Sequence, residues 1–134
     1  VRALADFSYA PENMAAAIAS GSFKTEGMIV APCSMKTLAA IAHGCADNLL
    51  VRAADVCLKE RRKVVLIPRE TPLSRIHLKN LLAADEAGCM IVPPMLTFYN
   101  KPADITAQMD HIIGKALMPF DLTPSTFHPW EGIT

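Results

Sequence analysis

The sequence predicts a three-layer α/β domain, in which helices cover both faces of a parallel β-sheet. Three short segments, at residues 27–31, 63–68 and 89–94, are mostly or entirely apolar, and segments of helical length separate them. Strands without polar alternation must be covered on both faces, and parallel strands need a crossover between them. The length of 134 residues suits one such domain.

The first half of the chain supplies the first strand and three helical segments. Residues 11–20 begin with Pro and Glu and continue with alanine-rich sequence, which predicts a helix that ends before Gly21. The apolar segment 27–31 is a predicted strand, and residues 34–43 follow it as a predicted helix closed by a glycine. Residues 48–62 carry apolar side chains along one side and predict a long amphipathic helix.

The second half continues the alternation of strands and helices. Residues 63–68 (KVVLIP) and 89–94 (CMIVPP) are predicted strands, and the intervening residues 74–88 predict a helix that ends in glycine. A last helix is predicted over residues 104–120, ahead of a proline-rich tail. Together these elements predict a Rossmann-like, flavodoxin-like parallel sheet flanked by helices, in a single domain over residues 1–134.

The overall charge and hydropathy exclude some classes of partner. Lys and Arg number 13, as do Asp and Glu, so no net charge attracts nucleic acid or an anionic membrane surface. No apolar stretch reaches the length of a transmembrane helix. We therefore expect no nucleic-acid partner and no membrane partner, and any anion site must come from a local group of cations.

The cysteines, at positions 33, 45, 57 and 89, form no CxxC pair and have no histidine at zinc-ligand spacing. Cys45, Cys57 and Cys89 lie in apolar or helical segments, which predicts buried, reduced thiols. Reduced thiols are typical of a cytoplasmic protein. Cys33 would need a neighbouring base to act as a nucleophile, and no histidine follows it closely, so we expect no chemical role for it.

Polar and basic residues follow each predicted strand, within residues 32–37, 68–74 and 93–102. In parallel sheets, ligands bind at the carboxyl ends of the strands. After the first strand, Ser34 is suited to cap the following helix, with Lys36 in its first turn. Plain capping is one interpretation, and the other is an anion site made by the helix N-terminus and the lysine charge.

The other two strand exits carry further candidates. Arg69 and Glu70 form either a solvated ion pair or a phosphate-binding cation beside a proton-transferring carboxylate, which Lys59 is able to join. Tyr99 is able to hydrogen-bond a ligand. Lys115 lies in an apolar helix and is either a snorkelling lysine or part of the site. The residues alone predict a site for an anionic, phosphate-bearing ligand.

Several longer motifs together resemble one known family. They are SGSF (20–23), PCSMKTLAAIAHG (32–44), RAADVCLKERR (52–62), PRETPLS (68–74), PPMLTFYNKP (93–102) and HPWEG (128–132). This set closely resembles that of the UbiX-type flavin prenyltransferases, formerly described as phenylacrylic or aromatic acid decarboxylases. The resemblance covers almost the whole chain. The motif RAADVCLKERR followed by PRETPLS is more specific than any single loop motif.

The resemblance implies an enzyme that binds FMN and dimethylallyl phosphate. Such an enzyme joins the dimethylallyl group to N5 and C6 of the reduced flavin, without a metal. The product, prenyl-FMN, is the cofactor of a UbiD-type decarboxylase, which is therefore the implied partner. The family also implies a large homo-oligomer, a dodecamer.

The resemblance also assigns roles to individual residues. Those implied to bind the flavin are Ser34, Met35, Lys36, Thr37 and Arg69. Those implied to bind dimethylallyl phosphate are Tyr99, Lys115 and Arg52. Those implied to be catalytic are Lys59 and Glu70, with Trp130 as a wall over the site. The family commonly has Arg where this chain has Lys115, and a lysine keeps the charge but loses the bidentate geometry.

The chain departs from the family at its beginning. The family starts with a strand and a glycine loop that holds the FMN phosphate, and we expect about fifty residues of this kind to precede Val1. Two rival functions stay open. A related flavin-dependent decarboxylase that acts on cysteine derivatives would carry a PxMNxxMW loop where this chain has PPMLTFYN. The other rival is a non-catalytic FMN carrier.

Overall fold

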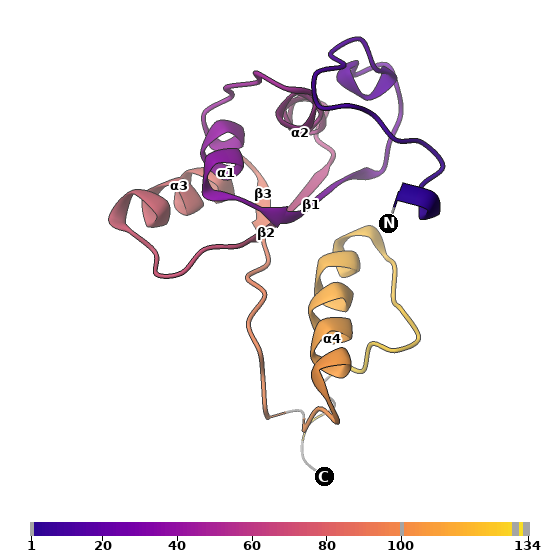
Figure 1. Cartoon of the computed structure of the whole chain (residues 1–134), viewed down its shortest axis with the longest axis vertical. Coiled ribbons are helices and arrows are strands. Elements are labelled where there is room, and N and C mark those ends of the chain that lie inside the picture. The colour runs from indigo at the N-terminus through magenta and orange to yellow at the C-terminus, as the bar shows by residue number, and fades with distance from the viewer. Residues whose placement is uncertain (1, 100, 130–131, 133–134) are drawn as a thin grey trace.

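The computed structural model describes residues 2–99, 101–129 and 132, and within them three strands form one parallel sheet. Strand β1 (Gly27–Cys33) pairs with β2 (Lys63–Pro68), which pairs with β3 (Cys89–Ile91). The pairs Gly27–Lys63 and Val64–Cys89 lie opposite each other, so the strands start at one edge of the sheet and end at the other. The predicted α/β class with a parallel sheet is confirmed (Figure 1).

The α-helices begin where the sequence predicts, because a polar side chain caps each of them. They are α1 (Met35–Ala42), α2 (Leu49–Lys59), α3 (Arg75–Glu86) and α4 (Ile105–Leu117). The caps, each accepting a hydrogen bond from the backbone N–H three residues on, are Ser34, Asn48, Ser74 and Asp104. Helix α2 ends three residues earlier than predicted, since Arg61 has a left-handed φ of 59°.

The helix predicted over residues 11–20 is wrong. The structure has only short 3-10 turns in this region, η1 (Arg2–Leu4) and η2 (Ala17–Ala19). Backbone groups of this segment form other hydrogen bonds instead: Asn13 N donates to Ala10 O in a turn, and Leu49 N donates to Pro11 O at 2.7 Å. An alanine-rich segment of ten residues is too short to hold a helix by propensity alone.

The third strand is also shorter than predicted. It ends at Ile91 rather than at residue 94, although Val92 N still donates to Leu66 O at 2.9 Å. Pro93 and Pro94 follow, and proline has no N–H to continue the pairing.

The core lies between the sheet and helices α1, α2 and α3. Each of these elements contributes to one buried cluster, for example Leu38 from α1, Val51 from α2, Ala84 from α3 and Leu66 from β2. Burial of such side chains on both sides of β2 explains why its sequence is apolar throughout. None of the helices in the described part of the chain is long and apolar enough to cross a membrane.

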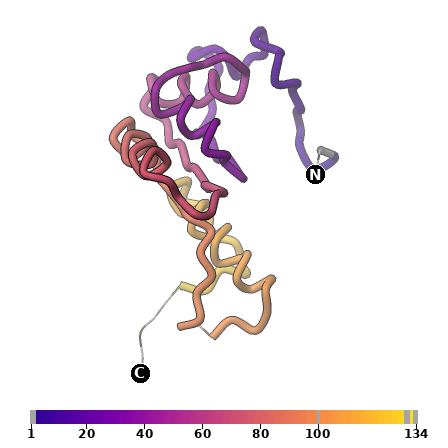
Figure 2. The backbone as a smooth tube through the Cα atoms, turned by 60° about the vertical axis from the view of Figure 1, so that its left-hand side comes forward, coloured from indigo at the N-terminus to yellow at the C-terminus, as the bar shows by residue number. Residues whose placement is uncertain are grey.

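Residues 92–129 form an arm that leaves the sheet. After β3 the chain runs in an extended course away from the strands, turns, and returns as α4 beyond the sheet layer (Figures 1 and 2). The returning end, η3 (Met118–Phe120), reaches the start of β2, where Lys63 Nζ lies 3.7 Å from Asp121 Oδ2 and 6.0 Å from the centre of the Phe120 ring. The apolar side chains of Ile105, Met109 and Ile113 on α4 are exposed.

Candidate functional site

The ends of the three strands meet at one edge of the sheet, as the sequence predicts. Arg69 N donates to Cys33 O at 2.9 Å, which ties the exit of β2 directly to the exit of β1. The bond from Val92 N to Leu66 O ties the exit of β3 to the same strand. The parallel pairing therefore brings the loops that begin at Ser34 and Arg69 together.

Helix α1 points its N-terminus at this edge. Ser34 Oγ accepts a hydrogen bond from Thr37 N at 3.2 Å and lies 3.0 Å from Thr37 Oγ1, so the two hydroxyls sit side by side. The N–H groups of Met35 and Lys36 belong to the first turn, where an α-helix offers them no carbonyl. Donors of this kind, with the positive end of the helix dipole, suit an anion.

The side chains of this turn differ in their access to a ligand. Lys36 is exposed, whereas Met35 is buried in the core. Met35 can therefore contribute its backbone N–H, while its side chain supports the turn from beneath. Ser34 and Thr37 are half-buried, between the exposed Lys36 and the buried Met35 in their access to solvent.

Cys33 has no access to a ligand at this corner. Its side chain is fully buried, and burial, together with the neighbouring Cys89 thiol, raises its pKa to about 11. Cys57 and Cys89 are buried and free, as predicted. The prediction for Cys45 is wrong: this thiol is exposed, because it lies in the turn after α1 rather than on a helix face.

Arg69 and Glu70 follow β2 and are both exposed. Glu70 Oε1 accepts a hydrogen bond from Thr71 N at 3.1 Å, and among the described residues no ion pair links Glu70 to Arg69. The two side chains therefore do not hold each other, and their role in binding stays a prediction. Both side chains are open to a ligand at the strand exits.

Tyr99 and Lys115 lie on the arm and face different hollows. Tyr99 lines a cavity of about 970 Å³ between the start of α4 and the tail, together with Asp110 and His111. Lys115 lines a smaller hollow of about 490 Å³, whose walls are Met90, Ile91, Val92, Pro93, Met118 and Pro119. The Lys115 ammonium lies 5.9 Å from the centre of the Phe127 ring. One chain therefore does not bring these two residues to the same hollow.

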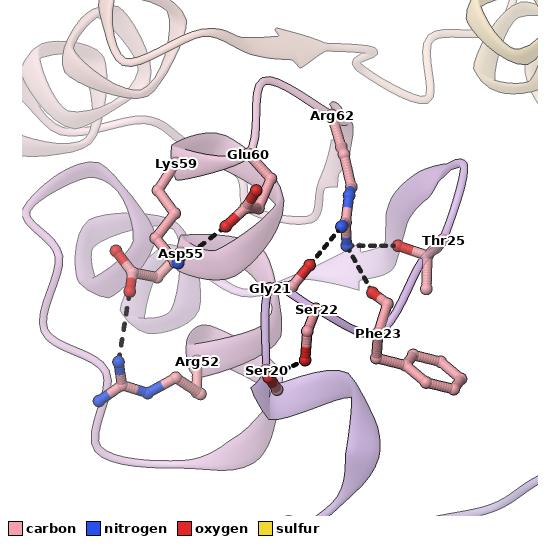
Figure 3. A network of polar contacts seen from close by, with 10 residues as sticks. All are labelled: Ser20, Gly21, Ser22, Phe23, Thr25, Arg52, Asp55, Lys59, Glu60 and Arg62. Carbon is pink, nitrogen blue, oxygen red and sulfur yellow. Dashed lines mark hydrogen bonds and ion pairs between the residues drawn. The ribbon is translucent and has the colours of Figure 1, made fainter.

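Arg52 and Lys59 belong to a separate polar network around α2 (Figure 3). Arg52 forms an ion pair with Asp55 at 3.4 Å, and Lys59 forms one with Glu60 at 2.8 Å. Lys59 closes α2 four residues before β2 starts, so roughly 17 Å of strand separates it from the exit at Arg69. Within one chain, the structure does not bring Lys59 to the strand exits.

Sequence reasoning missed two residues that hold loops. Arg62 donates to Gly21 O at 2.6 Å, to Phe23 O at 2.8 Å and to Thr25 Oγ1 at 3.4 Å, which fixes the segment before β1 (Figure 3). Gln108 bonds the backbone of Thr97 in the arm. No local pattern marks either residue, since their partners are backbone groups far away in the sequence. Trp130, a predicted wall of the site, lies outside the described residues.

No group of three or more His, Cys, Asp or Glu side chains gathers at metal-binding distance in the part of the chain that the structure describes. The groups at the strand exits are instead hydroxyls, backbone N–H groups and two cations, Lys36 and Arg69. This donor set fits a phosphate ester.

A parallel α/β sheet with a phosphate-type site at its strand exits is the arrangement of a flavin-binding protein, and a family model described as Flavoprotein matches residues 6–119. A probable UbiX-like flavin prenyltransferase of Sedimentibacter hydroxybenzoicus is 61% identical over 132 residues, which cover 98% of this chain and 70% of that protein. Flavin prenyltransferase UbiX of Neisseria meningitidis serogroup B is 50% identical over 133 residues, which cover 99% of this chain and 70% of that protein. The chain belongs to the UbiX-like flavin prenyltransferase family.

Two solved structures share the fold closely. The dodecameric FMN-dependent UbiX-like decarboxylase from Escherichia coli O157:H7 is 55% identical, with a TM-score of 0.93 over 97% of this chain and 70% of that one. AnUbiX in complex with FMN and dimethylallyl pyrophosphate is 52% identical, with a TM-score of 0.95 over 99% of this chain and 71% of that one. The chain spans only part of the length of its relatives. A probable UbiX-like flavin prenyltransferase of Bacillus subtilis, for example, is matched over 65% of its length.

Proposed function

We propose that this chain acts as a flavin prenyltransferase, which joins the dimethylallyl group of dimethylallyl phosphate to N5 and C6 of reduced FMN. The observation that carries the proposal is the junction of Ser34 and Arg69 at the strand exits, where Arg69 N bonds Cys33 O beside the N-terminus of α1. The ligands of AnUbiX, FMN and dimethylallyl pyrophosphate, support a flavin and a dimethylallyl donor as the substrates, although that donor carries one phosphate more than the one proposed here.

The flavin belongs at the strand exits. The hydroxyls of Ser34 and Thr37, the first N–H groups of α1 and the charges of Lys36 and Arg69 suit the polar groups of the flavin, and its phosphate would be shared with the glycine loop that the family resemblance implies. Reduced FMN supplies the two atoms that form the new bonds.

The prenyl donor belongs where cations and apolar walls meet. The hollow that Lys115 lines is otherwise made of Met, Ile, Val and Pro side chains, which suits a dimethylallyl group with an anionic head. In the reaction, the carbon–oxygen bond to phosphate breaks as the first dimethylallyl carbon bonds to N5, which loses its proton. The double bond of the transferred group then takes up a proton at its inner carbon while its substituted carbon bonds to C6, which loses its proton, so the phosphate departs with one proton in net. Lys115 stabilises the departing phosphate and Glu70 carries a displaced proton, whereas Tyr99, which lines a different hollow of the same chain, reaches the phosphate only across a contact between copies.

A contact between two copies of the chain is the way in which residues of the arm would join residues of the strand exits. The arm runs away from the sheet after β3 (Figure 2), whereas Lys115 on α4 lines a hollow beside β3. The apolar side chains of Ile105, Met109 and Ile113 on α4 are exposed. The E. coli relative is dodecameric. We therefore propose a homo-oligomer in which the arm of one copy completes the strand-exit site of another. The roles of Arg52 and Lys59 stay proposals of the same kind, with Lys59 able to act only across such a contact.

The experiment separates the two ligands. Lys115→Ala and Tyr99→Phe should lower the affinity for dimethylallyl phosphate about tenfold or more, because each removes a hydrogen bond to a charged group. The affinity for FMN should stay unchanged. Arg69→Ala should lower the affinity for FMN in the same assay. Lys79→Ala, which removes a charge from the exposed side of α3, is the matched control and should change neither affinity. Equal loss of both ligands in the arm variants would contradict the proposed division of the site.

The rival function is FMN binding without prenyl transfer, and it is favoured by one observation, the placement of Tyr99 and Lys115 in different hollows of a single chain. A protein of that kind would bind FMN and release it unchanged to a partner enzyme. In the proposed function, the product is instead prenyl-FMN, which a UbiD-type decarboxylase receives.

A further inference from the structure

Gln108 is the only buried polar or charged side chain in the described part of the chain, at 4% exposure. It lies in the first turns of α4, a helix with an exposed apolar face on which its neighbour Met109 is 54% exposed. A buried amide costs free energy unless its hydrogen-bonding groups are satisfied. The partners of Gln108 therefore explain why the residue is there.

Both partners belong to one residue of the arm. Gln108 Oε1 accepts a hydrogen bond from Thr97 N at 3.0 Å, and Gln108 Nε2 donates to Thr97 O. The side-chain amide thus takes the place of a neighbouring strand for Thr97. A carboxylate cannot donate and an apolar side chain can do neither, so the double contact needs an amide of this reach.

Side-chain packing does little to fix the same segment. Met95 is 68% exposed, Leu96 is 53% exposed and Phe98 is 76% exposed. The helix is itself anchored, since Asp104 caps it through Ala107 N at 2.9 Å. Gln108 therefore transfers the fixed position of α4 to the backbone of the segment.

Two residues further along the chain is Tyr99. Lys101 N donates to Phe98 O at 3.1 Å, so the chain turns there and Tyr99 lines the cavity of about 970 Å³. Asp110 and His111 of α4 line the same cavity. The helix turn that carries Gln108 thus contributes to the wall of the cavity and, through Thr97, holds the segment that carries Tyr99.

We propose that Gln108 is a positioning residue for the prenyl donor: through both backbone groups of Thr97 it sets where the Tyr99 side chain meets the substrate phosphate. The inference rests on the proposed function, in which Tyr99 binds that phosphate. It predicts a residue that touches neither ligand and yet controls the affinity for only one of them.

The test uses Gln108→Met, which keeps the length and volume of the side chain and removes both hydrogen bonds. We expect the KM for dimethylallyl phosphate to rise about tenfold, with kcat and the Kd for FMN within about twofold of the wild type. Met109→Leu, on the exposed face of the same helix, should match the wild type. Gln108→Asn, which keeps the amide but shortens its reach by one methylene, should also raise the KM and serves if the Met variant does not fold.

A double variant separates positioning from general stability. If Gln108 acts through the Tyr99 hydroxyl, Gln108→Met should add little to the KM of Tyr99→Phe. An unchanged KM in Gln108→Met, or a full tenfold effect in the Tyr99→Phe background, would overturn the inference while leaving the proposed function intact. A wild-type protein that forms no prenylated flavin would overturn the proposed function itself, and with it this inference.

Discussion

The buried thiols give the protein a pH-dependent stability. Burial raises the pKa of Cys33 and of Cys89 from 9.0 to about 11. The folded state therefore holds these protons more tightly than the unfolded state, so the stabilisation is complete below about pH 9 and is lost as the pH rises toward 11. We expect the urea midpoint to fall over that interval, and to fall less in the variant with both residues changed to Ala. An equal fall in the two proteins would contradict the buried, protonated state of the thiols.

Gly114 is a second residue whose role follows from its surroundings. A Cβ at this position would lie 2.0 Å from Phe127 Cδ2, and the same ring stacks on His111 at 5.5 Å and lies beneath Lys115. Gly114→Ala should therefore displace the ring and destabilise the protein by about 1–3 kcal/mol, although alanine is the better helix former.

The matched control for Gly114 removes the ring. In a Phe127→Ala background, Gly114→Ala should be stabilising by up to about 1 kcal/mol, because only the helix propensity remains. Denaturant unfolding of the four proteins measures both effects. Destabilisation of similar size in the two backgrounds would show that Phe127 does not occupy the space over Gly114.

At the scale of the elements, the start of β1 depends on a glycine. Gly27 has a φ of 147°, and a Cβ there would lie 2.2 Å from Lys63 O, the backbone of the paired strand. Gly27→Ala should therefore lower the free energy of unfolding by about 2 kcal/mol or more, because strand pairing itself must shift. Gly44 also has a positive φ, of 67°, but no atom lies within 4 Å of its Cβ position.

Gly44→Ala is thus the matched control for backbone strain without a clash. Its cost should be near 1 kcal/mol. Thermal or urea unfolding of both variants provides the comparison, and a Gly27 variant no less stable than the Gly44 variant would contradict the close approach of β1 and β2.

The helices that are capped and packed on the sheet were predictable from the sequence, because their start signals are local. Ser34, Asn48, Ser74 and Asp104 each stand directly before the helix that they cap. The segment 11–20 has helix-forming composition but packs on α2 as turns and the short η2, with Ala16 buried, and nothing local reveals that.

The residues of the candidate site also divide into those that the sequence could place and those that it could not. Ser34 and Arg69 could be placed together because parallel strands end at one edge, a rule that needs only the order of elements. The separation of Tyr99 from Lys115, and of Lys59 from the strand exits, depends on the course of the arm and on which end of α2 carries the lysine. Gln108 and Arg62 were not predictable, since each recognises distant backbone.

At the scale of the whole molecule, the arm predicts a site shared between copies. Arg69→Ala damages the strand exits and Lys115→Ala damages the arm, so each variant alone should have far less than wild-type activity at ligand concentrations below saturation. Mixed and co-refolded, the two should regain a fraction of activity, because some contacts then pair an intact strand-exit site with an intact arm. Two copies of the same variant should regain none. No recovery in the mixture would contradict a site built from two copies.

The central claim is that the strand exits and the arm together transfer a dimethylallyl group to reduced FMN. The most direct measurement is mass spectrometry of the flavin released after the protein, as its own gene encodes it, has been incubated anaerobically with reduced FMN and dimethylallyl phosphate. The account predicts a flavin heavier by one C₅H₈ unit, formed by the wild type and by Met109→Leu, and formed far more slowly by Arg69→Ala and Lys115→Ala at ligand concentrations below saturation. Unmodified FMN recovered from a wild-type protein that binds both ligands would contradict it.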